Sequence, residues 1–226
     1  MLKQRKIHQI IFDCDGVLVD SEILANRVEA EVKTEMGFPI TLEEQIKKFV
    51  GMGKDHPILQ DELKKFPPSY WQAIDERIKS VYEAELKTIA GTVEALENLD
   101  LPKCVASNSE PEWLEYKLSL TGLKKYFGEA IFHGKLVKRS KPAPDLFLFA
   151  LEKMGWSATD CLVIEDSVPG VKAGKAAGLT VCGFLGGAHI LEGHAELLRE
   201  AGADFLISDL RALDISNWNL TKLPLN

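Results

Sequence analysis

The sequence has few cysteines, no long apolar run and no excess of basic residues. Its four cysteines are far apart and form no C-x-x-C pair, so we expect reduced core residues of a cytoplasmic protein. Lysine and arginine number 27 against 34 aspartate and glutamate, which argues against broad binding to nucleic acid or to an anionic membrane. No segment approaches the roughly 18 apolar residues of a membrane helix, and the N-terminal apolar stretch meets Asp13 too early for a signal peptide.

The composition is that of a globular chain with a sizeable core. Of the 226 residues, 46% are hydrophobic, so neither disulfides nor a structural metal should be needed to hold the fold. At roughly 150 residues per domain, this length corresponds to about one and a half domains.

Short apolar runs that end at polar residues predict six β-strands. The first, Ile7 to Phe12, stops abruptly at Asp13-Cys14-Asp15-Gly16. The other predicted strands are Lys103 to Ser107, Ala130 to His133, Cys161 to Glu165, Thr180 to Phe184 and Asp204 to Ile207. Helical periodicity marks the segments Thr92 to Leu99, Pro111 to Thr121, Asp145 to Met154, Val168 to Ala177 and Gly193 to Ala201. This alternation predicts an α/β fold, a doubly wound Rossmann-like parallel sheet with helices on both faces.

The alternation breaks from Ser21 to about Thr88, where the patterns are helical. Two amphipathic helices are marked by Ile23-Leu24, Val28 and Val32 and by Tyr70-Trp71, Ile74, Ile78 and Tyr82. We therefore predict a small helical domain, residues 21–88, inserted into an α/β core formed by residues 1–20 and 89–226.

Polar residues at the predicted strand ends indicate the chemistry, because ligands of an open parallel sheet bind beyond the carboxyl ends of its strands. Asp13 and Asp15 leave the same face of an extended chain, and two close carboxylates repel unless a cation compensates. Glu165-Asp166 could complete an oxygen pocket of the kind that Mg²⁺ prefers, Lys141 adds positive charge, and Ser107 adds a hydroxyl. Such a set indicates phosphoryl transfer, with Asp13 as the nucleophile that forms an aspartyl-phosphate and Asp15 as the acid and later the base.

At these residues the sequence resembles the haloacid dehalogenase superfamily, over essentially the whole chain. The first motif of the family, DxDG before a hydrophobic run and an acid, corresponds to Asp13 through Asp20, and the strand-end serine of the second corresponds to Ser107. The third motif corresponds to Lys141, and the fourth to Glu165-Asp166-Ser167 with Gly170 following.

The predicted insert resembles the α-helical cap of one subfamily. That subfamily holds phosphoglycolate phosphatases, sugar-phosphate phosphatases and β-phosphoglucomutases. The stretch from Ile89 to Ser109 looks most like bacterial phosphatases of the 6-phosphogluconate type.

The resemblance implies a role for each motif residue. Asp13 is implied as nucleophile and metal ligand, and Asp15 as acid and base with its backbone carbonyl on the metal. Asp166 resembles a direct Mg²⁺ ligand, whereas Glu165 is either a ligand or one step removed through water. The resemblance further implies that Ser107 and Asn108 contact the phosphoryl oxygens and that Lys141 bridges the nucleophile and the phosphate. The usual glycine before this lysine is Ser140 here, which slightly alters the loop.

The insert offers further candidates for substrate binding. Lys54 follows Gly51-Met52-Gly53, a loop that in related caps faces the active site, so Lys54 could bind an anionic group; a solvated lysine fits equally well. Glu22, with Asn26 and Arg27, could line the entrance. A lone histidine such as His56 is more often structural, and the aromatic stripe of Tyr70, Trp71 and Tyr82 is typical of a helical core.

The leading hypothesis is a Mg²⁺-dependent phosphatase acting on a small phosphorylated metabolite, a sugar phosphate or sugar-acid phosphate. The alternative is a β-phosphoglucomutase, although that mutase carries a histidine where this chain has Ala25. Dehalogenases lack the second acid, and a phosphonate hydrolase would want a reactive cap lysine, for which Lys33, Lys47, Lys48 and Lys54 stay open. A non-catalytic binding protein on the same fold would not need Asp13, Asp15, Lys141 and Asp166 together. We expect a monomer with no nucleic-acid or membrane partner.

Overall fold

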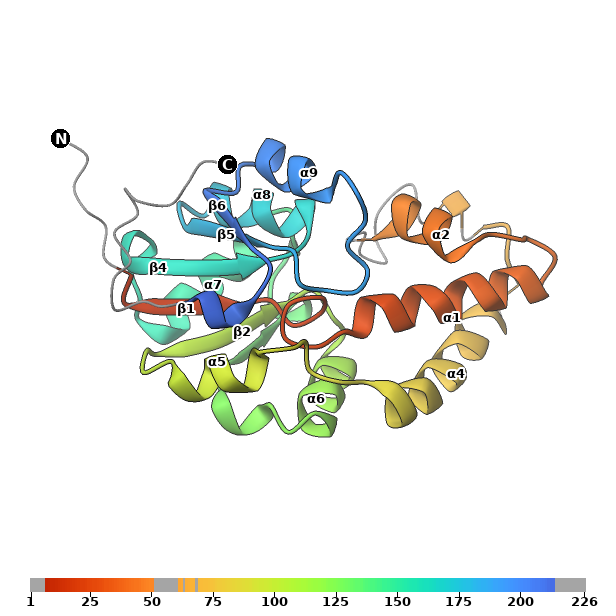
Figure 1. Cartoon of the computed structure of the whole chain (residues 1–226), viewed down its shortest axis with the longest axis horizontal. Helices are drawn as coiled ribbons and strands as arrows, with labels where there is room; N and C mark the ends of the chain where they lie inside the picture. The colour runs from red at the N-terminus through yellow and green to blue at the C-terminus, as the bar shows by residue number, and fades with distance from the viewer. Residues whose placement is uncertain (1–6, 51–60, 63, 68, 214–226) are drawn as a thin grey trace.

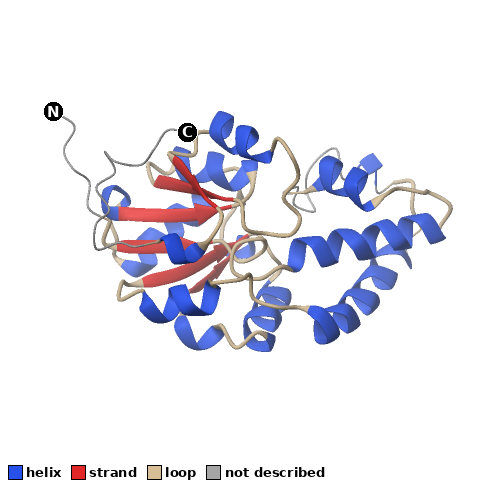
Figure 2. Ribbon diagram, viewed as in Figure 1, coloured by secondary structure: helices blue, strands red, loops and turns tan. Residues whose placement is uncertain are grey.

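The computed structural model describes residues 7–50, 61–62, 64–67 and 69–213. The predicted substrate residue Lys54, its glycine loop and His56 lie outside these residues. The described chain forms a central sheet with helices on both faces and a helical region beyond one end of the sheet (Figures 1 and 2).

The sheet has six strands, all parallel, in the order β3-β2-β1-β4-β5-β6. The strands are β1 (Gln9–Phe12), β2 (Lys103–Ser107), β3 (Ile131–His133), β4 (Cys161–Glu165), β5 (Thr180–Phe184) and β6 (Phe205–Ile207). The first strand is central, and the chain order reverses on its two sides, which confirms the predicted doubly wound fold. Phe12 lies opposite both Val105 and Ile164, so the ends of β1, β2 and β4 come together at one edge.

Two hydrophobic clusters cover the two faces of the sheet. Phe12, Val105 and Ile164 point to the face covered by α5 (Thr92–Asn98) and α6 (Pro111–Leu120). Their neighbours Ile11 and Val163 point to the other face, which α7 (Asp145–Met154), α8 (Val168–Ala176) and α9 (His194–Ala201) cover. Because side chains alternate along a strand, one apolar run supplies both clusters. All four cysteines are buried and unpaired, as the sequence predicts.

Between β1 and β2 the described residues form helices alone, apart from single bridging pairs at Val19. Those that precede α5 are α1 (Ser21–Glu35), α2 (Leu42–Phe49) and α4 (Ser69–Glu85). Helices α1 and α4 share a separate hydrophobic cluster that includes Val28, Val32, Tyr70 and Tyr82. The two amphipathic patterns and the aromatic stripe are therefore confirmed as core, while the boundaries of the insert as a domain stay a prediction.

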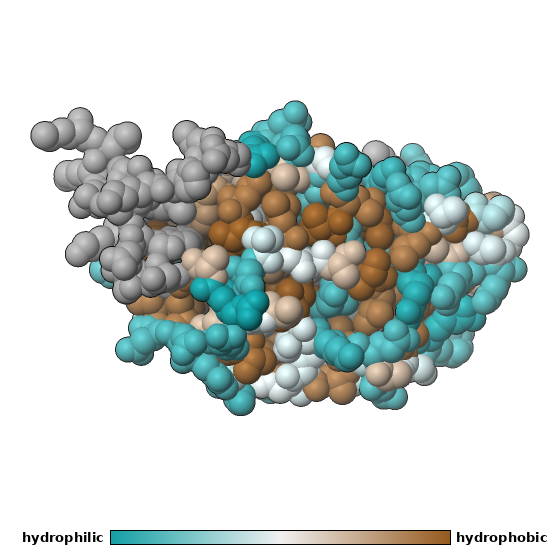
Figure 3. Space-filling model, viewed as in Figure 1, coloured by the Kyte–Doolittle hydropathy of each residue, from teal (hydrophilic) through white to brown (hydrophobic). Residues whose placement is uncertain are grey.

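The described surface carries hydrophilic side chains over most of its periphery in the view of Figure 3, with hydrophobic ones mainly in the middle of that face. The exposed large hydrophobic residues belong to different parts of the chain: Phe38, Val93, Leu120, Leu136, Leu148 and Leu197. Isolated exposures of this kind are normal for globular proteins. Among the described residues, no helix combines the length and hydrophobicity that a membrane crossing requires.

Candidate active site

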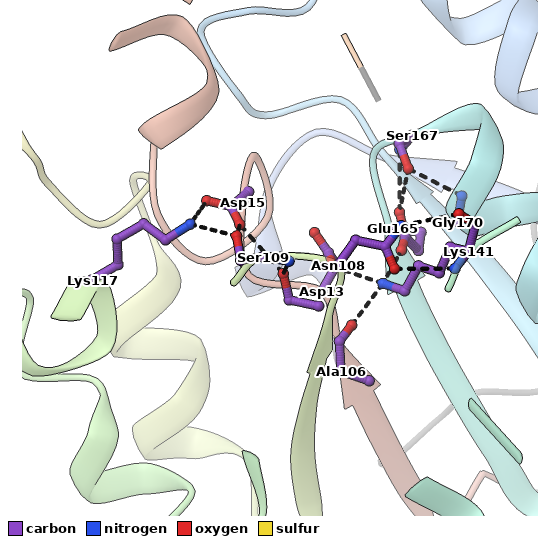
Figure 4. Close-up of polar contacts among 11 residues, drawn as sticks. Asp13, Asp15, Ala106, Asn108, Ser109, Lys117, Lys141, Glu165, Ser167 and Gly170 are labelled. Carbon is purple, nitrogen blue, oxygen red and sulfur yellow. Dashed lines mark hydrogen bonds and ion pairs between the residues drawn. The ribbon is translucent and has the colours of Figure 1, made fainter. Parts of the chain in front are cut away.

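Polar side chains converge beyond the carboxyl ends of β1, β2 and β4, at the edge of the sheet that faces the helical insert (Figures 1 and 4). The backbone N–H of Asp13 continues the ladder of β1 by donating to the carbonyl of Ile164 at 3.0 Å. Asp13 is 7% exposed and Glu165 fully buried. The parallel register thus places both carboxylates at one edge, as the strand ends predict.

Lys141 lies at the centre of this cluster. Its ammonium donates to Asp13 Oδ1 at 2.7 Å, to Glu165 Oε1 at 2.5 Å and to the carbonyl oxygen of Ala106 at 2.6 Å (Figure 4). These three acceptors come from β1, β4 and β2, so one lysine joins three strand ends. Its three donors are all used, which offsets the cost of burying the charge.

Asn108 holds the loop that carries Lys141. Its side-chain amide donates to the carbonyl of Lys141 at 3.0 Å and accepts from the N–H of Lys141 at 3.1 Å. The bond between Lys141 and Pro142 is cis. The paired hydrogen bonds fix the lysine backbone against the end of β2. The predicted second and third motifs are therefore joined by hydrogen bonds.

Glu165 is held on both sides. Lys141 bonds one carboxylate oxygen, and the hydroxyl and N–H of Ser167 donate to the other at 2.9 and 3.3 Å. Ser167 also caps α8 by accepting from the N–H of Gly170 at 3.1 Å. A Cβ atom at Gly170 would lie 1.9 Å from the carboxylate carbon of Glu165, so only glycine fits below this side chain.

Asp13, Glu165 and Asp166 each offer a carboxylate oxygen within 4.8 Å of the others, and all three are buried. The chemistry of the set suits a hard divalent cation such as Mg²⁺, which prefers oxygen ligands. Three buried carboxylates face one lysine, so a cation would balance the excess negative charge. Since both oxygens of Glu165 already accept hydrogen bonds, Asp13 and Asp166 are the better placed to hold an ion.

His189 lies beside Asp166, although the sequence gives little reason to look there. Its Nε2 is 2.9 Å from Asp166 Oδ2, a charge contact, and its Nδ1 has no hydrogen-bond partner among the described residues. The ring is 1% exposed. Burial alone would lower the pKa of His189, but the nearby Asp166 carboxylate outweighs it and raises the pKa above its ordinary value.

Asp15 has a different set of partners on the side of α6. Its carboxylate accepts from Ser109 Oγ at 2.5 Å and Ser107 Oγ at 3.3 Å, and it also accepts from Ser21 and from the ammonium of Lys117. Lys117 donates in addition to Ser109 Oγ at 2.8 Å. Ser109 follows β2 within the predicted strand-end motif, whereas Lys117 has no signal in the sequence; both contact a predicted catalytic acid.

The two neighbouring acids have opposite electrostatic environments. Burial raises the pKa of Asp13 well above its ordinary value, and Lys141 offsets this only in part because Glu165 and Asp166 add like charge. Burial also acts to raise the pKa of Asp15, but the Lys117 ammonium and the serine hydroxyls outweigh it and leave the pKa below the ordinary value. A cation held by Asp13 would act against the rise in its pKa, because a nearby positive charge favours the ionised carboxylate.

Glu22 lies half-buried on the first turn of α1 and faces the same edge. Burial and the charge of Asp15 raise the pKa of Glu22 to about 7, with His189 lowering it in part. Its carboxylate accepts from Asn26 Nδ2 at 3.2 Å. The predicted entrance residues Glu22 and Asn26 therefore lie together, close to the charged cluster.

Three lysines of the insert that the sequence leaves open as reactive, Lys33, Lys47 and Lys48, pair with residues of the insert itself. Lys33 is 1% exposed and donates to Gln45 Oε1 at 2.8 Å. Lys47 pairs with Glu43 at 2.6 Å and Lys48 with Glu62 at 3.2 Å. A surface pocket of about 590 Å³ lies among these residues, and its lining comes wholly from residues 33–66 rather than from the strand ends. We therefore place the chemistry at the carboxylate cluster and not in this pocket.

A comparison with protein families gives the class of the chain. The model of the haloacid dehalogenase-like hydrolases matches residues 7–178. The chain belongs to this family, and its fold and strand-end motifs fit that assignment. The predicted superfamily and the prediction of an enzyme are thereby confirmed.

Individual relatives narrow the comparison. The chain is 28% identical to the 6-phosphogluconate phosphatase of Escherichia coli K12, over 81% of this chain and 85% of the relative. It is 33% identical to a phosphorylated carbohydrates phosphatase of Thermotoga maritima, over 91% of this chain and 96% of the relative. The crystal structure of a haloacid dehalogenase-like protein of unknown function from Agrobacterium tumefaciens superposes on this chain with a TM-score of 0.83. The two chains are 40% identical, and the match covers 92% of this chain and 96% of the other.

Proposed function

We propose that the protein is a Mg²⁺-dependent phosphatase that hydrolyses a small phosphorylated metabolite through an aspartyl-phosphate on Asp13. The observation that carries this proposal is the Lys141 ammonium between Asp13 and Glu165, at 2.7 and 2.5 Å. A nucleophilic carboxylate beside a buried cation suits the transfer of a group whose negative charge must be stabilised.

The residues of the cluster divide the tasks. Lys141 holds Asp13 through Oδ1, which leaves Oδ2 to attack the phosphorus. The hydroxyl of Ser107 and the backbone N–H of Asn108, at the end of β2, would bind the phosphoryl oxygens. Asp13 and Asp166 would hold the metal with the carbonyl of Asp15, and Glu165 would act one step removed by fixing Lys141. A bound Mg²⁺ would supply positive charge that stabilises the phosphoryl group in the transition state.

The proposed reaction has two steps, in which the phosphoryl group is first bound to Asp13 and then released from it. Asp13 Oδ2 forms a bond to phosphorus while the bond from phosphorus to the leaving oxygen breaks, and Asp15 gives that oxygen its proton. Asp15 then takes a proton from water as the water oxygen bonds to phosphorus. The bond between phosphorus and Asp13 breaks, which restores the carboxylate and releases inorganic phosphate.

The names of two relatives support a proposal for the substrate class. Both curated relatives above are named for phosphatases of sugar or sugar-acid phosphates, so we propose a sugar phosphate or sugar-acid phosphate as substrate. Helices α1 and α4 lie beyond the carboxyl ends of the strands (Figure 1), where they would limit the size of a substrate and exclude water.

The mechanism is tested with p-nitrophenyl phosphate. We expect hydrolysis that requires Mg²⁺, stops on chelation, and falls to background in Asp13→Asn, which removes the nucleophile with little change in shape. Mass spectrometry of the protein quenched in acid should find a phosphoryl group on Asp13. Lys175→Met, which changes an exposed pair with Asp204 in the last turn of α8, serves as control and should keep full activity. Unchanged hydrolysis by Asp13→Asn would rule the mechanism out.

The substrate is tested by phosphate release from a panel of sugar phosphates, hexitol phosphates, 6-phosphogluconate and phosphoglycolate. A specific enzyme should prefer one class by at least about tenfold in kcat/KM. Equal rates on every sugar phosphate would contradict selection by the insert. Conversion of β-glucose 1-phosphate to glucose 6-phosphate would instead identify a mutase.

A further inference from the structure

Lys117 is a buried lysine that the proposed reaction does not use. It lies on α6 between Leu114 and Leu118, which belong to the core, and it is 3% exposed. Its ammonium contacts the Asp15 carboxylate and lies 2.8 Å from Ser109 Oγ. A leucine would satisfy the packing at this position on the helix at lower cost, since burying an ammonium is unfavourable unless it is paired.

The contacts of Lys117 fix the direction of the Asp15 side chain. Ser109 Oγ donates to Asp15 Oδ2 at 2.5 Å while accepting from Lys117, so the three groups form a closed triangle (Figure 4). Ser21 and Ser107 add two hydroxyl donors. Among the described residues, Lys117 is the charged donor to this carboxylate, and hydrogen bonds to charged groups are about twice as strong as neutral ones.

Asp13 and Asp15 each pair with a different lysine. Lys141 bonds Asp13 and Lys117 bonds Asp15, from different parts of the chain. In the described part of the chain, neither lysine bonds the acid of the other. Each carboxylate is therefore held in place by its own cation.

We propose that Lys117 is a positioning residue, which holds the side chain of Asp15 in place so that the proton Asp15 takes from water in one cycle is given to the leaving group in the next. The inference rests on the proposed phosphatase function. Lys117 would act through Asp15 and not on the phosphoryl group, because its ammonium is occupied by Asp15 and Ser109. Its loss should then matter only where a leaving group needs a proton.

The test compares two substrates of similar ring size in Lys117→Met. The p-nitrophenolate leaving group is stable without a proton, whereas the benzyl alkoxide released from benzyl phosphate needs one. We expect kcat/KM for benzyl phosphate to fall roughly tenfold to a hundredfold, because general acid catalysis depends on exact placement of the acid. For p-nitrophenyl phosphate, kcat/KM should stay within about threefold of wild type, since this constant reports the step that forms the aspartyl-phosphate.

Two further variants separate positioning from folding. Lys33→Met removes an equally buried lysine of the insert and should leave the ratio of the two kcat/KM values unchanged. In an Asp15→Asn background, Lys117→Met should cause no further loss with benzyl phosphate, since its effect passes through Asp15. If Lys117→Met does not fold, as judged by circular dichroism, Lys117→Gln is measured in its place.

The outcomes are distinct. Equal losses on both substrates, or an additive effect with Asp15→Asn, would overturn the positioning role while leaving the phosphatase function intact. A wild-type protein that hydrolyses neither phosphate ester with Mg²⁺ present would overturn the proposed function itself.

Discussion

Replacing Lys141 with methionine tests whether one ammonium compensates the buried carboxylates. Methionine keeps the length and the apolar stem of lysine but removes its charge and its donors. The variant loses hydrogen bonds to Asp13 at 2.7 Å, Glu165 at 2.5 Å and the carbonyl of Ala106 at 2.6 Å. Two carboxylates, 7% and 0% exposed, are then left facing each other without a cation.

The expected cost is roughly 3–5 kcal/mol in the free energy of unfolding, the range for removing one partner of a buried ion pair. For a chain of this length, each kcal/mol lowers the melting temperature by about 2–4 °C, so we expect a drop of roughly 6–20 °C.

The cost should also depend on pH. Burial raises the pKa values of Asp13 and Glu165 even with Lys141 present. Above the ordinary carboxyl pKa the folded state therefore binds more protons than the unfolded state, and stability falls as pH rises. Without Lys141 this loss becomes steeper, so the variant should differ from wild type more at pH 8 than at pH 5.

Urea unfolding in the presence of a chelator, at both pH values, measures these differences. Lys175→Met is the matched control, because Lys175 pairs with Asp204 at 2.7 Å but is about a third exposed; exposed pairs contribute about 0–1 kcal/mol. A change below about 1 kcal/mol in Lys141→Met at pH 8, or one equal at both pH values, would refute the compensating role of the ammonium.

Two further predictions concern neighbours of the cluster. In Gly170→Ala the new Cβ would lie 1.9 Å from the Glu165 carboxylate carbon, so displacement of Glu165 and Lys141 should lower kcat about a hundredfold; Gly134→Ala, whose nearest contact is 3.3 Å, should keep most activity. In the wild type, the pKa of the Glu22 carboxyl is raised to about 7, so this carboxyl destabilises the folded state as pH rises from about 4.5 to 7. Glu22→Gln removes it. Because Glu22 is half-buried, chelator-treated Glu22→Gln should gain about 1–2 kcal/mol on wild type between pH 5 and pH 8 in urea titrations; parallel stability curves would contradict the raised pKa.

The strands and most helices could be predicted because the local pattern alone decides them. Lys103–Ser107, Cys161–Glu165 and Thr180–Phe184 have the predicted bounds, since each is an apolar run closed by polar residues. Helix α2 was not identified individually, although Thr41 and Glu44 form a capping box at its start, a signal visible in the sequence.

The motif residues of the site could be predicted because strand order carries distant segments to one edge. Asp13, Lys141 and Glu165 are far apart in the chain but contact one another in the structure. Lys117 and His189 could not be found this way, because neither follows a strand directly or, like Lys141, belongs to a motif of the family that the sequence resembles. Lys117 sits in an amphipathic helix, where a lysine usually faces solvent, and only the packing of α6 against Asp15 shows otherwise.

The separation of the two acids depends on that packing. Asp13 and Asp15 are two residues apart and emerge from one strand, so by sequence they should share an environment. In the structure, Asp13 contacts Lys141 and lies beside two further carboxylates, whereas Asp15 accepts hydrogen bonds from Lys117 and three serine hydroxyls. In the proposed reaction the two acids have different tasks, one as nucleophile and one as acid and base, so different partners for their carboxylates are consistent with it. The division of labour proposed here thus rests on two lysines brought in from outside the strand that carries the acids.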